Sequence, residues 1–418
     1  MPISSPRQTE SEEGISTSDL VVDISRLAAY LKSHQYAGCD PYDGLESAVF
    51  KASPFRYSKW ARLAMIQAVK RSPVNLRWLL GVPDGRNPKG IALCVSAWTA
   101  NSQADEPERE ESLAEVDSLL DYLKTIRIEG YPGRPWGYNF SWQSRSFYAP
   151  RGLPNAICTI FAAQAFLDAF EQTKNVEYLA VAREASEFLL ACLKVEDGGE
   201  LHFRYIPTAD SQVHNVNLLA AALLARLAML GGNPDLPHVA RRAISFSVKR
   251  QRPDGSWPYG EAENQAWVDN YHTGFNLVAL RKYREYSGDD SVSEAIARGY
   301  RFWDGHFFGP DGAPAFYANQ LYPIDVHCVA QSILTYLEFA GADAHALDRC
   351  FQTYAWARKH LQAEDGTFFF QKHEHYTIKI SYVRWGQAWM FLALTRLRLA
   401  MTEREPVALD RPSRASMN

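Results

Sequence analysis

Gln251-Arg252-Pro253-Asp254-Gly255-Ser256-Trp257 is the stretch that decides the fold of this chain, because it ends a pair of helical segments and its Asp-Gly turn recurs. Asp-Gly pairs also stand at Asp197-Gly198, Asp311-Gly312 and Asp365-Gly366. The four glycines follow one another at steps of 57, 57 and 54 residues. A fixed period of this length indicates a repeat architecture, in which each unit buries its apolar face only against its neighbours.

Each unit contains two amphipathic helices separated by a turn. Leucines recur at helical spacing from Leu219 to Leu230, Gly231-Gly232-Asn233-Pro234 stops this helix, and a second helix follows over 237–250. Comparable patterns predict helices over 24–33, 61–69, 91–99, 112–126, 156–171, 178–192, 273–286, 292–302, 326–339, 346–361 and 386–400.

These helix pairs approach six, which is enough to close a ring. We therefore predict an all-α fold: an (α/α)6 toroid of helical hairpins with an aromatic-rich central cleft. The toroid domain is expected over residues 19–402, with disordered tails at 1–18 and 403–418. An open superhelix is the alternative arrangement. Closure is favoured because the segments that lead into the inner helices are too aromatic for exterior loops.

Composition narrows the choice of partners. The chain has 418 residues, 46% of them hydrophobic, and a formal net charge of −4. No global basic field is present, so neither nucleic acid nor an anionic membrane is favoured as partner. The N-terminal residues lack an apolar signal-peptide core, and no run of 18 apolar residues occurs. We expect a cytoplasmic protein without stable membrane insertion and with six free cysteines, and the oligomeric state stays open.

One repeat unit resembles a known superfamily. Arg242-Ala243-x-x-Phe246 followed by Gln251-x-x-x-Gly255-x-Trp257 is similar to the QW-type repeat of the squalene–hopene cyclases and prenyltransferases. That resemblance implies a helical toroid. Cyclase or prenyl-diphosphate chemistry would in addition require a DxDD or DDxxD motif, and the sequence contains neither.

A second resemblance covers more of the chain. The segments 40–45, 70–77, 87–90 and 136–143 are similar to little-characterised proteins encoded in bacterial surface-polysaccharide loci. This resemblance implies a role in making or trimming a glycan. The toroid is also the scaffold of six-hairpin glycosidases, many polysaccharide lyases and the helical domain of glucuronyl C5-epimerases.

The loops that enter the inner helices of such a toroid meet at one mouth, and here they carry aromatic, polar and basic side chains. Flat aromatic rings cover the faces of a sugar, whereas amide, carboxylate, imidazole and guanidinium groups satisfy its hydroxyl rim. Arginine suits a glycan that bears carboxylate or phosphate. The predicted substrate-binding residues are Trp136, Tyr138, Trp142, Gln143, Arg145, Trp257, Tyr259, Asp325, His327, Arg384 and Trp385.

Proton transfer requires a base near these residues, and three histidines recur in phase with the repeat at His214, His272 and His327. The predicted catalytic residues are His272, Asp269, Tyr271, His214 and Tyr205. Two alternatives stay open: Asp269 caps a helix, and the repeated histidines only bond neighbouring loops. A three-histidine metal site is a weaker alternative, and we predict no metal and no other cofactor. Lys89 and Arg86 are interpreted as solvated side chains.

The leading functional hypothesis is an enzyme of bacterial surface-polysaccharide biosynthesis that acts on an acidic glycan or glycan precursor as a uronyl epimerase, lyase or hydrolase. A non-catalytic glycan-binding or assembly protein of the same pathway is the second hypothesis. The third is an isoprenoid cyclase or prenyltransferase-like enzyme.

Overall fold

The computed structural model describes residues 16–103, 108–318 and 320–402, and within these ranges the chain forms six helical hairpins. The pairs are α5 (Pro88–Asn101) with α6 (Glu108–Thr125), α7 (Ala156–Thr173) with α8 (Val176–Phe188), α9 (His214–Met229) with α10 (Leu236–Val248), α11 (Asn270–Ser287) with α12 (Ser293–His306), α13 (Val326–Phe339) with α14 (Ala346–Leu361), and α15 (Ala388–Thr402) with α1 (Thr17–Ser33).

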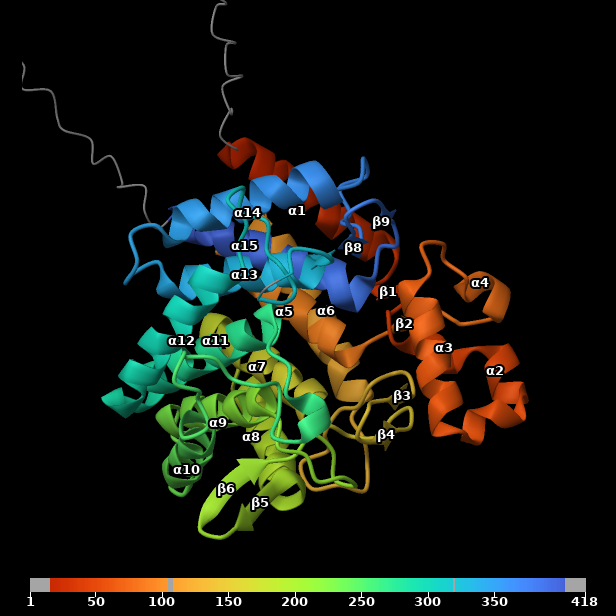
Figure 1. Cartoon of the computed structure of the whole chain (residues 1–418). Coiled ribbons are helices and arrows are strands. Elements are labelled where there is room, and N and C mark those ends of the chain that lie inside the picture. Colours follow the sequence, from red (N-terminus) through yellow and green to blue (C-terminus); the bar gives the residue numbers. More distant parts are fainter. Residues whose placement is uncertain (1–15, 104–107, 319, 403–418) are drawn as a thin grey trace, which may run out of the picture.

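The hairpins close into a ring. Each of the inner helices α5, α7, α9, α11, α13 and α15 packs against the next, and α15 packs against α5. The first helix, α1, packs on the last, α15, at the top of Figure 1. It is also tied to α14, where the Tyr354 hydroxyl donates to Asp23 at 2.6 Å. The predicted closed all-α toroid is confirmed, and the open superhelix is wrong for this chain.

Three of the Asp-Gly turns bring the chain against the next outer helix. Gly255 has φ +94°, and a Cβ there would stand 2.4 Å from the carbonyl oxygen of Arg298 in α12. Only glycine combines this left-handed conformation with so close an approach. The Asp254 carboxylate accepts the backbone N–H of Ser256 at 2.9 Å, which shapes the turn. The equivalent glycines, with φ +81° and +86°, are Gly312 against Gln352 of α14 and Gly366 against Arg26 of α1.

The first Asp-Gly pair differs from the other three. Asp197 ends strand β5 (Lys194–Asp197), which pairs antiparallel with β6 (Glu200–Phe203). Gly198 lies in the hairpin turn, where a Cβ would have no described neighbour within 4 Å. One hairpin earlier, Gly133 makes the close contact instead, since a Cβ there would lie 2.0 Å from the Glu184 carbonyl oxygen of α8. The period in the sequence therefore identifies the repeat, but not every turn within it.

The helix boundaries at the chain ends follow capping rather than apolar spacing. Helix α1 begins at Thr17, upstream of the expected Ile24 and inside the span assigned to a tail, because Ser16 and Asp19 form a capping box. Helices α13 and α14 have the predicted bounds. The expected tails at 1–15 and 403–418 lie outside the described residues.

Residues 43–80 form a helical lobe beside the ring, drawn in orange at the right of Figure 1. It contains η1 (Asp43–Glu46), α2 (Ala48–Ala52), η2 (Pro54–Tyr57), α3 (Lys59–Arg71) and α4 (Arg77–Leu80). The predicted helix over 61–69 is thus α3 of the lobe and not part of the toroid.

Short strands and turns connect these elements. Strand β1 (Ala37–Gly38) pairs with β2 (Gly85–Arg86), β3 (Trp142–Gln143) pairs with β4 (Tyr148–Ala149), and β7 (Ile324–Asp325), β8 (Gln371–Lys372) and β9 (Thr377–Ile378) form a three-stranded sheet. The remaining short helical elements are η3 (Leu189–Leu193), η4 (Glu263–Gln265), η5 (Asp290–Val292) and η6 (Val383–Gln387). All six cysteines are free thiols, as predicted. No helix within the described residues is long and apolar enough to cross a bilayer.

Candidate functional site

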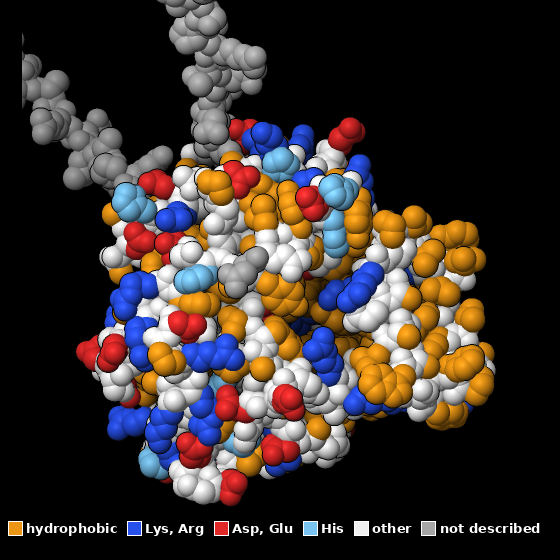
Figure 2. Space-filling view, in the orientation of Figure 1, with side chains coloured by type: hydrophobic (Ala, Val, Ile, Leu, Met, Phe, Trp, Pro, Cys, Tyr) orange, Lys and Arg blue, Asp and Glu red, His pale blue; other side chains and the backbone are white. Residues whose placement is uncertain are grey.

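A cavity of about 750 Å³ lies at one end of the ring, and Figure 2 shows the hollow between the ring and the lobe. The first residues of the inner helices reach it all the way round: Lys89, Ile157, Asn215, His272, His327 and, just before α15, Arg384. Helix N-termini carry partial positive charge, so their convergence favours an anionic ligand. The predicted site residues that line this cavity are Tyr138, Trp142, Gln143, Arg145, Tyr205, Tyr259, Tyr271, His272, His327, Arg384 and Trp385.

His272 is held by Asp269 at the start of α11. The Asp269 carboxylate lies 2.7 Å from His272 Nδ1, and its other oxygen accepts the backbone N–H of His272 at 2.9 Å. Asp269 is therefore both a helix cap and the partner of the imidazole. With Nδ1 donating to Asp269, Nε2 is the acceptor of the neutral ring, and it has no hydrogen-bond partner within the described residues. This geometry orients a base toward the cavity.

His327 is the second histidine in the cavity, and it lies across the Tyr271 ring from His272. The centroid of Tyr271 is 4.1 Å from that of His272 and 4.7 Å from that of His327. Neither nitrogen of His327 has a hydrogen-bond partner among the described residues, although its side chain is buried. Burial, together with the positive charges of Lys89 and Arg384, holds the pKa of His327 well below its usual range. An unsatisfied buried imidazole of this kind is a strong candidate for contact with a ligand.

Lys89 also reaches the cavity, and the sequence interpretation of a solvated side chain is wrong. Its ammonium group lies 4.4 Å from the Phe161 ring, 5.4 Å from Phe275 and 5.0 Å from Trp389. No ion pair joins it to a carboxylate within the described residues. Burial, and next the charge of Arg384, lowers the pKa of Lys89 to about 7. The one sequence signal for the position of Lys89 was the helix-capping Asn87-Pro88 pair in front of it, which places Lys89 in the first turn of an inner helix.

This buried amine gives the protein a pH-dependent stability. Between pH 7 and 10.5 the unfolded chain carries a proton on Lys89 that the folded chain has lost, so the free energy of unfolding should rise with pH. We expect the wild type to gain about 2–3 kcal/mol more than Lys89→Met between roughly pH 6 and pH 9. Urea unfolding of both proteins at the two pH values measures the difference. Equal gains would contradict a pKa of Lys89 that burial lowers in the folded protein.

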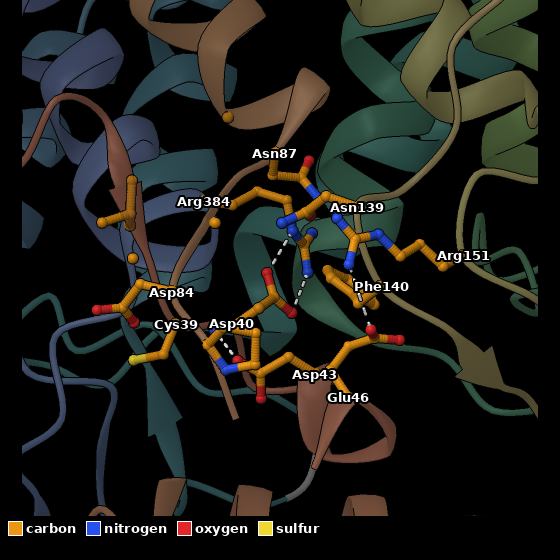
Figure 3. Close-up of a pocket in the computed structure, with 15 residues that line it drawn as sticks. Cys39, Asp40, Asp43, Glu46, Asp84, Asn87, Asn139, Phe140, Arg151 and Arg384 are labelled. Atoms are coloured by element: carbon orange, nitrogen blue, oxygen red, sulfur yellow. Dashed lines mark hydrogen bonds and ion pairs between the residues drawn. The ribbon is translucent and has the colours of Figure 1, made fainter. Parts of the chain in front are cut away.

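Arg384 is fixed by a buried ion pair. Its Nε lies 2.5 Å and its Nη2 2.7 Å from the two oxygens of Asp40, and both side chains are about 4% exposed. Figure 3 shows this pair beside a second, polar cavity of about 50 Å³, whose walls include Asp43, Asn87 and Arg384. Asp40 thus anchors the cavity residue Arg384 from behind.

Positive charge dominates the larger cavity. Its Lys70 donates to the Tyr42 hydroxyl at 2.8 Å. Burial opposes the charged form of Lys70, but this hydrogen bond and the nearby Asp325 carboxylate outweigh burial and raise the pKa of Lys70. The cations in the described lining are Lys59, Lys70, Arg71, Lys89, Arg145 and Arg384, and no Asp or Glu side chain is among the described lining residues. The cations come from four separate parts of the sequence, namely α3, Lys89, Arg145 and Arg384, so only the fold brings all of them together.

Aromatic rings supply the other walls. Tyr259 stacks on Trp267 with centroids 4.6 Å apart, and Tyr138 stacks on Phe140 at 5.2 Å. The hydroxyls of Tyr138 and Tyr205 are 2.8 Å apart. Such flat, partly polar surfaces are suited to the faces and hydroxyls of sugar rings.

Five predicted site residues do not line the cavity: Asp269, which holds His272, and four that lie elsewhere. Trp136 and Trp257 are buried core residues whose indole N–H groups donate to the carbonyls of Leu123 and Ser247. His214 is fully buried between Glu261, at 2.7 Å, and Ser247, at 3.1 Å.

The fourth of these residues, Asp325, acts behind the cavity wall. It accepts the indole N–H of Trp385 at 2.9 Å and the Gln371 amide at 2.7 Å, so it positions Trp385 rather than facing a ligand. Because His214 lies elsewhere, the three histidines do not converge. Within the described residues no group of three or more His, Cys, Asp or Glu is arranged to hold a metal ion.

Comparison with known proteins identifies the fold. No protein-family model and no curated protein matches the sequence. A sugar epimerase from a ruminal bacterium is similar in structure, with a TM-score of 0.64, 10% identity, and coverage of 93% of this chain and 99% of that one. The cellobiose 2-epimerase of Bacillus thermoamylovorans matches with a TM-score of 0.60 and 10% identity, over 75% of this chain and 87% of that one. An unsaturated glucuronyl hydrolase specific for heparin matches with a TM-score of 0.59 and 13% identity, over 92% of this chain and 96% of that one. The chain therefore has the six-hairpin (α/α)6 fold, which it shares with sugar epimerases and glycoside hydrolases.

Proposed function

We propose that this protein is an enzyme that removes a proton from the carbon next to the carboxylate of a uronic acid residue in an acidic glycan. The observation that carries this proposal is the make-up of the cavity. Two histidines and six cationic side chains line it, and the described lining contains no Asp or Glu side chain.

The roles follow from the geometry. His272 Nε2 takes the proton as the C–H bond breaks, and the Asp269 carboxylate stabilises the imidazolium that results. The electron pair moves into the substrate carboxylate, where negative charge grows. Arg384 and Lys89 are the cations that stabilise this charge in a buried setting. Return of a proton to the opposite face gives epimerisation. Loss of the neighbouring C4–oxygen bond gives elimination.

Hydrolysis has weaker support. Glycoside hydrolases place two carboxylic acids about 5–5.5 Å or 6.5–9.5 Å apart across the bond that is cleaved. The predicted site carboxylates Asp269 and Asp325 do not line the cavity, and neither does Glu261, which pairs with His214. An isoprenoid cyclase is also disfavoured, because the cavity cations would destabilise a carbocation.

The place of the protein in bacterial surface-polysaccharide biosynthesis is part of the proposal. Its support is the resemblance of segments 40–45, 70–77, 87–90 and 136–143 to proteins of such loci. In the structure Arg77 of the second segment bonds Asp43 of the first at 2.7 Å. The third segment, 87–90, lies beside the Asp40–Arg384 pair, where Asn87 and Gly90 line the same small cavity. A glycan-binding protein without turnover is the second candidate, which the aromatic walls would serve equally well.

One experiment separates these functions. The protein is incubated in D₂O with oligosaccharides that contain glucuronate, mannuronate or galacturonate, and products are followed by NMR and mass spectrometry. We expect deuterium at C5 with inversion for an epimerase, or an unsaturated end whose C5 carries no hydrogen for a lyase. A new reducing end with neither deuterium uptake nor an unsaturated end would instead establish hydrolysis. Binding with neither exchange nor cleavage across the panel would establish the non-catalytic role.

A further inference from the structure

The lobe carries an unusual share of the exposed hydrophobic surface. It holds seven of the fourteen large hydrophobic side chains that are exposed within the described residues. Trp78 is 80% exposed, Trp60 76% and Tyr57 73%. The remaining four are Val49, Phe55, Val74 and Leu79. Figure 2 shows orange side chains over much of the lobe at the right. Exposed apolar patches of this kind are typical of interaction surfaces.

The charge of the lobe is one-sided. Its basic residues are Lys51, Arg56, Lys59, Arg62, Lys70, Arg71 and Arg77. Its only acidic residues are Asp43 and Glu46; both are buried, and they pair with Arg77 at 2.7 Å and Lys51 at 2.6 Å. The outer surface of the lobe therefore combines aromatic rings with cations and has no exposed carboxylate of its own.

Basic and aromatic side chains adjoin one another on this surface. The Arg56 guanidinium lies 4.7 Å from the Tyr57 ring, and the Lys59 ammonium lies 5.9 Å from the Trp60 ring. Tryptophan and tyrosine prefer the headgroup level of a bilayer, and lysine and arginine are attracted to anionic lipid. A surface with both properties is suited to lie in the interface without spanning it.

The lobe also forms one wall of the cavity. Lys59, Trp60, Leu63 and Arg71 of α3 all line it, and Figure 2 shows the hollow next to the apolar side chains of the lobe. Any surface that binds the lobe is consequently brought close to the mouth of the cavity.

We propose that the lobe docks the protein on the surface of an anionic phospholipid bilayer, with the cavity mouth held next to the lipid headgroups. A second copy of the chain fits this surface less well, because a symmetric contact through the lobe would set cations against cations. Docking of this kind gives the cavity access to glycans that are attached to a lipid. The inference rests on the lobe alone and stands whether or not the cavity performs proton transfer.

Sedimentation with lipid vesicles tests the proposal on the full chain. We expect the wild type to bind vesicles of phosphatidylcholine and phosphatidylglycerol mixed at about 3:1, and to bind pure phosphatidylcholine at least tenfold more weakly. Raising the salt from about 0.1 M to about 0.5 M should weaken binding further, since it screens the lobe cations. Replacing Trp78 and Leu79 together by serine should weaken binding tenfold or more. Neither residue lines the cavity.

A matched pair elsewhere on the ring serves as the control. Val176 and Met229 are 74% and 52% exposed, and their replacement by serine should leave vesicle binding unchanged. Light scattering of the same proteins records their mass. The proposal is overturned if the wild type does not bind anionic vesicles, or if the lobe and control variants bind alike. It is also overturned if the wild type is a dimer that the lobe variant separates, because the lobe is then a contact between copies.

Discussion

His272→Ala is expected to lower kcat by roughly 10²–10⁴-fold, the usual contribution of a positioned general base. The loss follows from the removal of the one imidazole that is both oriented by a carboxylate and directed at the cavity, where Asp269 lies 2.7 Å from Nδ1. Binding should change little, because the aromatic and cationic walls stay in place. The rate of deuterium uptake at C5 and the dissociation constant of the same oligosaccharide measure the two effects separately.

Two companion variants make this result interpretable. Asp269→Asn retains a helix cap but no longer fixes the tautomer or stabilises the imidazolium, so it should also lower kcat with little change in binding. His345→Ala changes a side chain that is 81% exposed and should have no effect. Full exchange activity in a folded His272→Ala protein would remove His272 from the mechanism.

Asp40→Asn is expected to destabilise the fold by about 3–5 kcal/mol, because it leaves the Arg384 guanidinium charged, buried and without its partner. The pair joins the segment before the lobe to the turn before α15, 344 residues further along the chain. Its loss should loosen the last hairpin and the cavity wall together. Urea unfolding at constant pH measures the change in the free energy of unfolding.

An exposed ion pair provides the comparison. Asp121 and Lys124 are 2.8 Å apart, and the Asp121 side chain is 70% exposed, so Asp121→Asn should cost less than about 1 kcal/mol. Adding Arg384→Met to Asp40→Asn should restore part of the lost stability, since both charges are then gone. A cost for Asp40→Asn no larger than that for Asp121→Asn would show that the buried pair contributes nothing.

The local signals for the ring were in the sequence. Apolar spacing gave the helices that became α13 and α14 with their bounds, and the Asp-Gly period identified the repeat. Apolar spacing depends on residues within one or two turns of each other, and the period depends on a short turn motif that repeats along the chain, so neither requires knowledge of the spatial neighbours. The strong charge bias of the lobe was also readable, but the net charge of −4 for the whole chain concealed it.

The cavity was only partly predictable, and the three phased histidines show why. His214 is the first residue of its helix, His327 the second and His272 the third. One residue turns a side chain by about 100° around a helix, so an equal repeat number does not give an equal direction. His272 and His327 face the cavity, whereas His214 is buried against Glu261.

What the sequence alone determined is therefore the sequence of hairpins and the end of the ring at which polar loops gather. The tertiary structure decided which of those side chains are enclosed together. Lys89 is the clearest case: rings from α7, α11 and α15 surround its ammonium group and lower its pKa to about 7. Burial of a charge depends on every element packed around it, and no local pattern of residues contains that information.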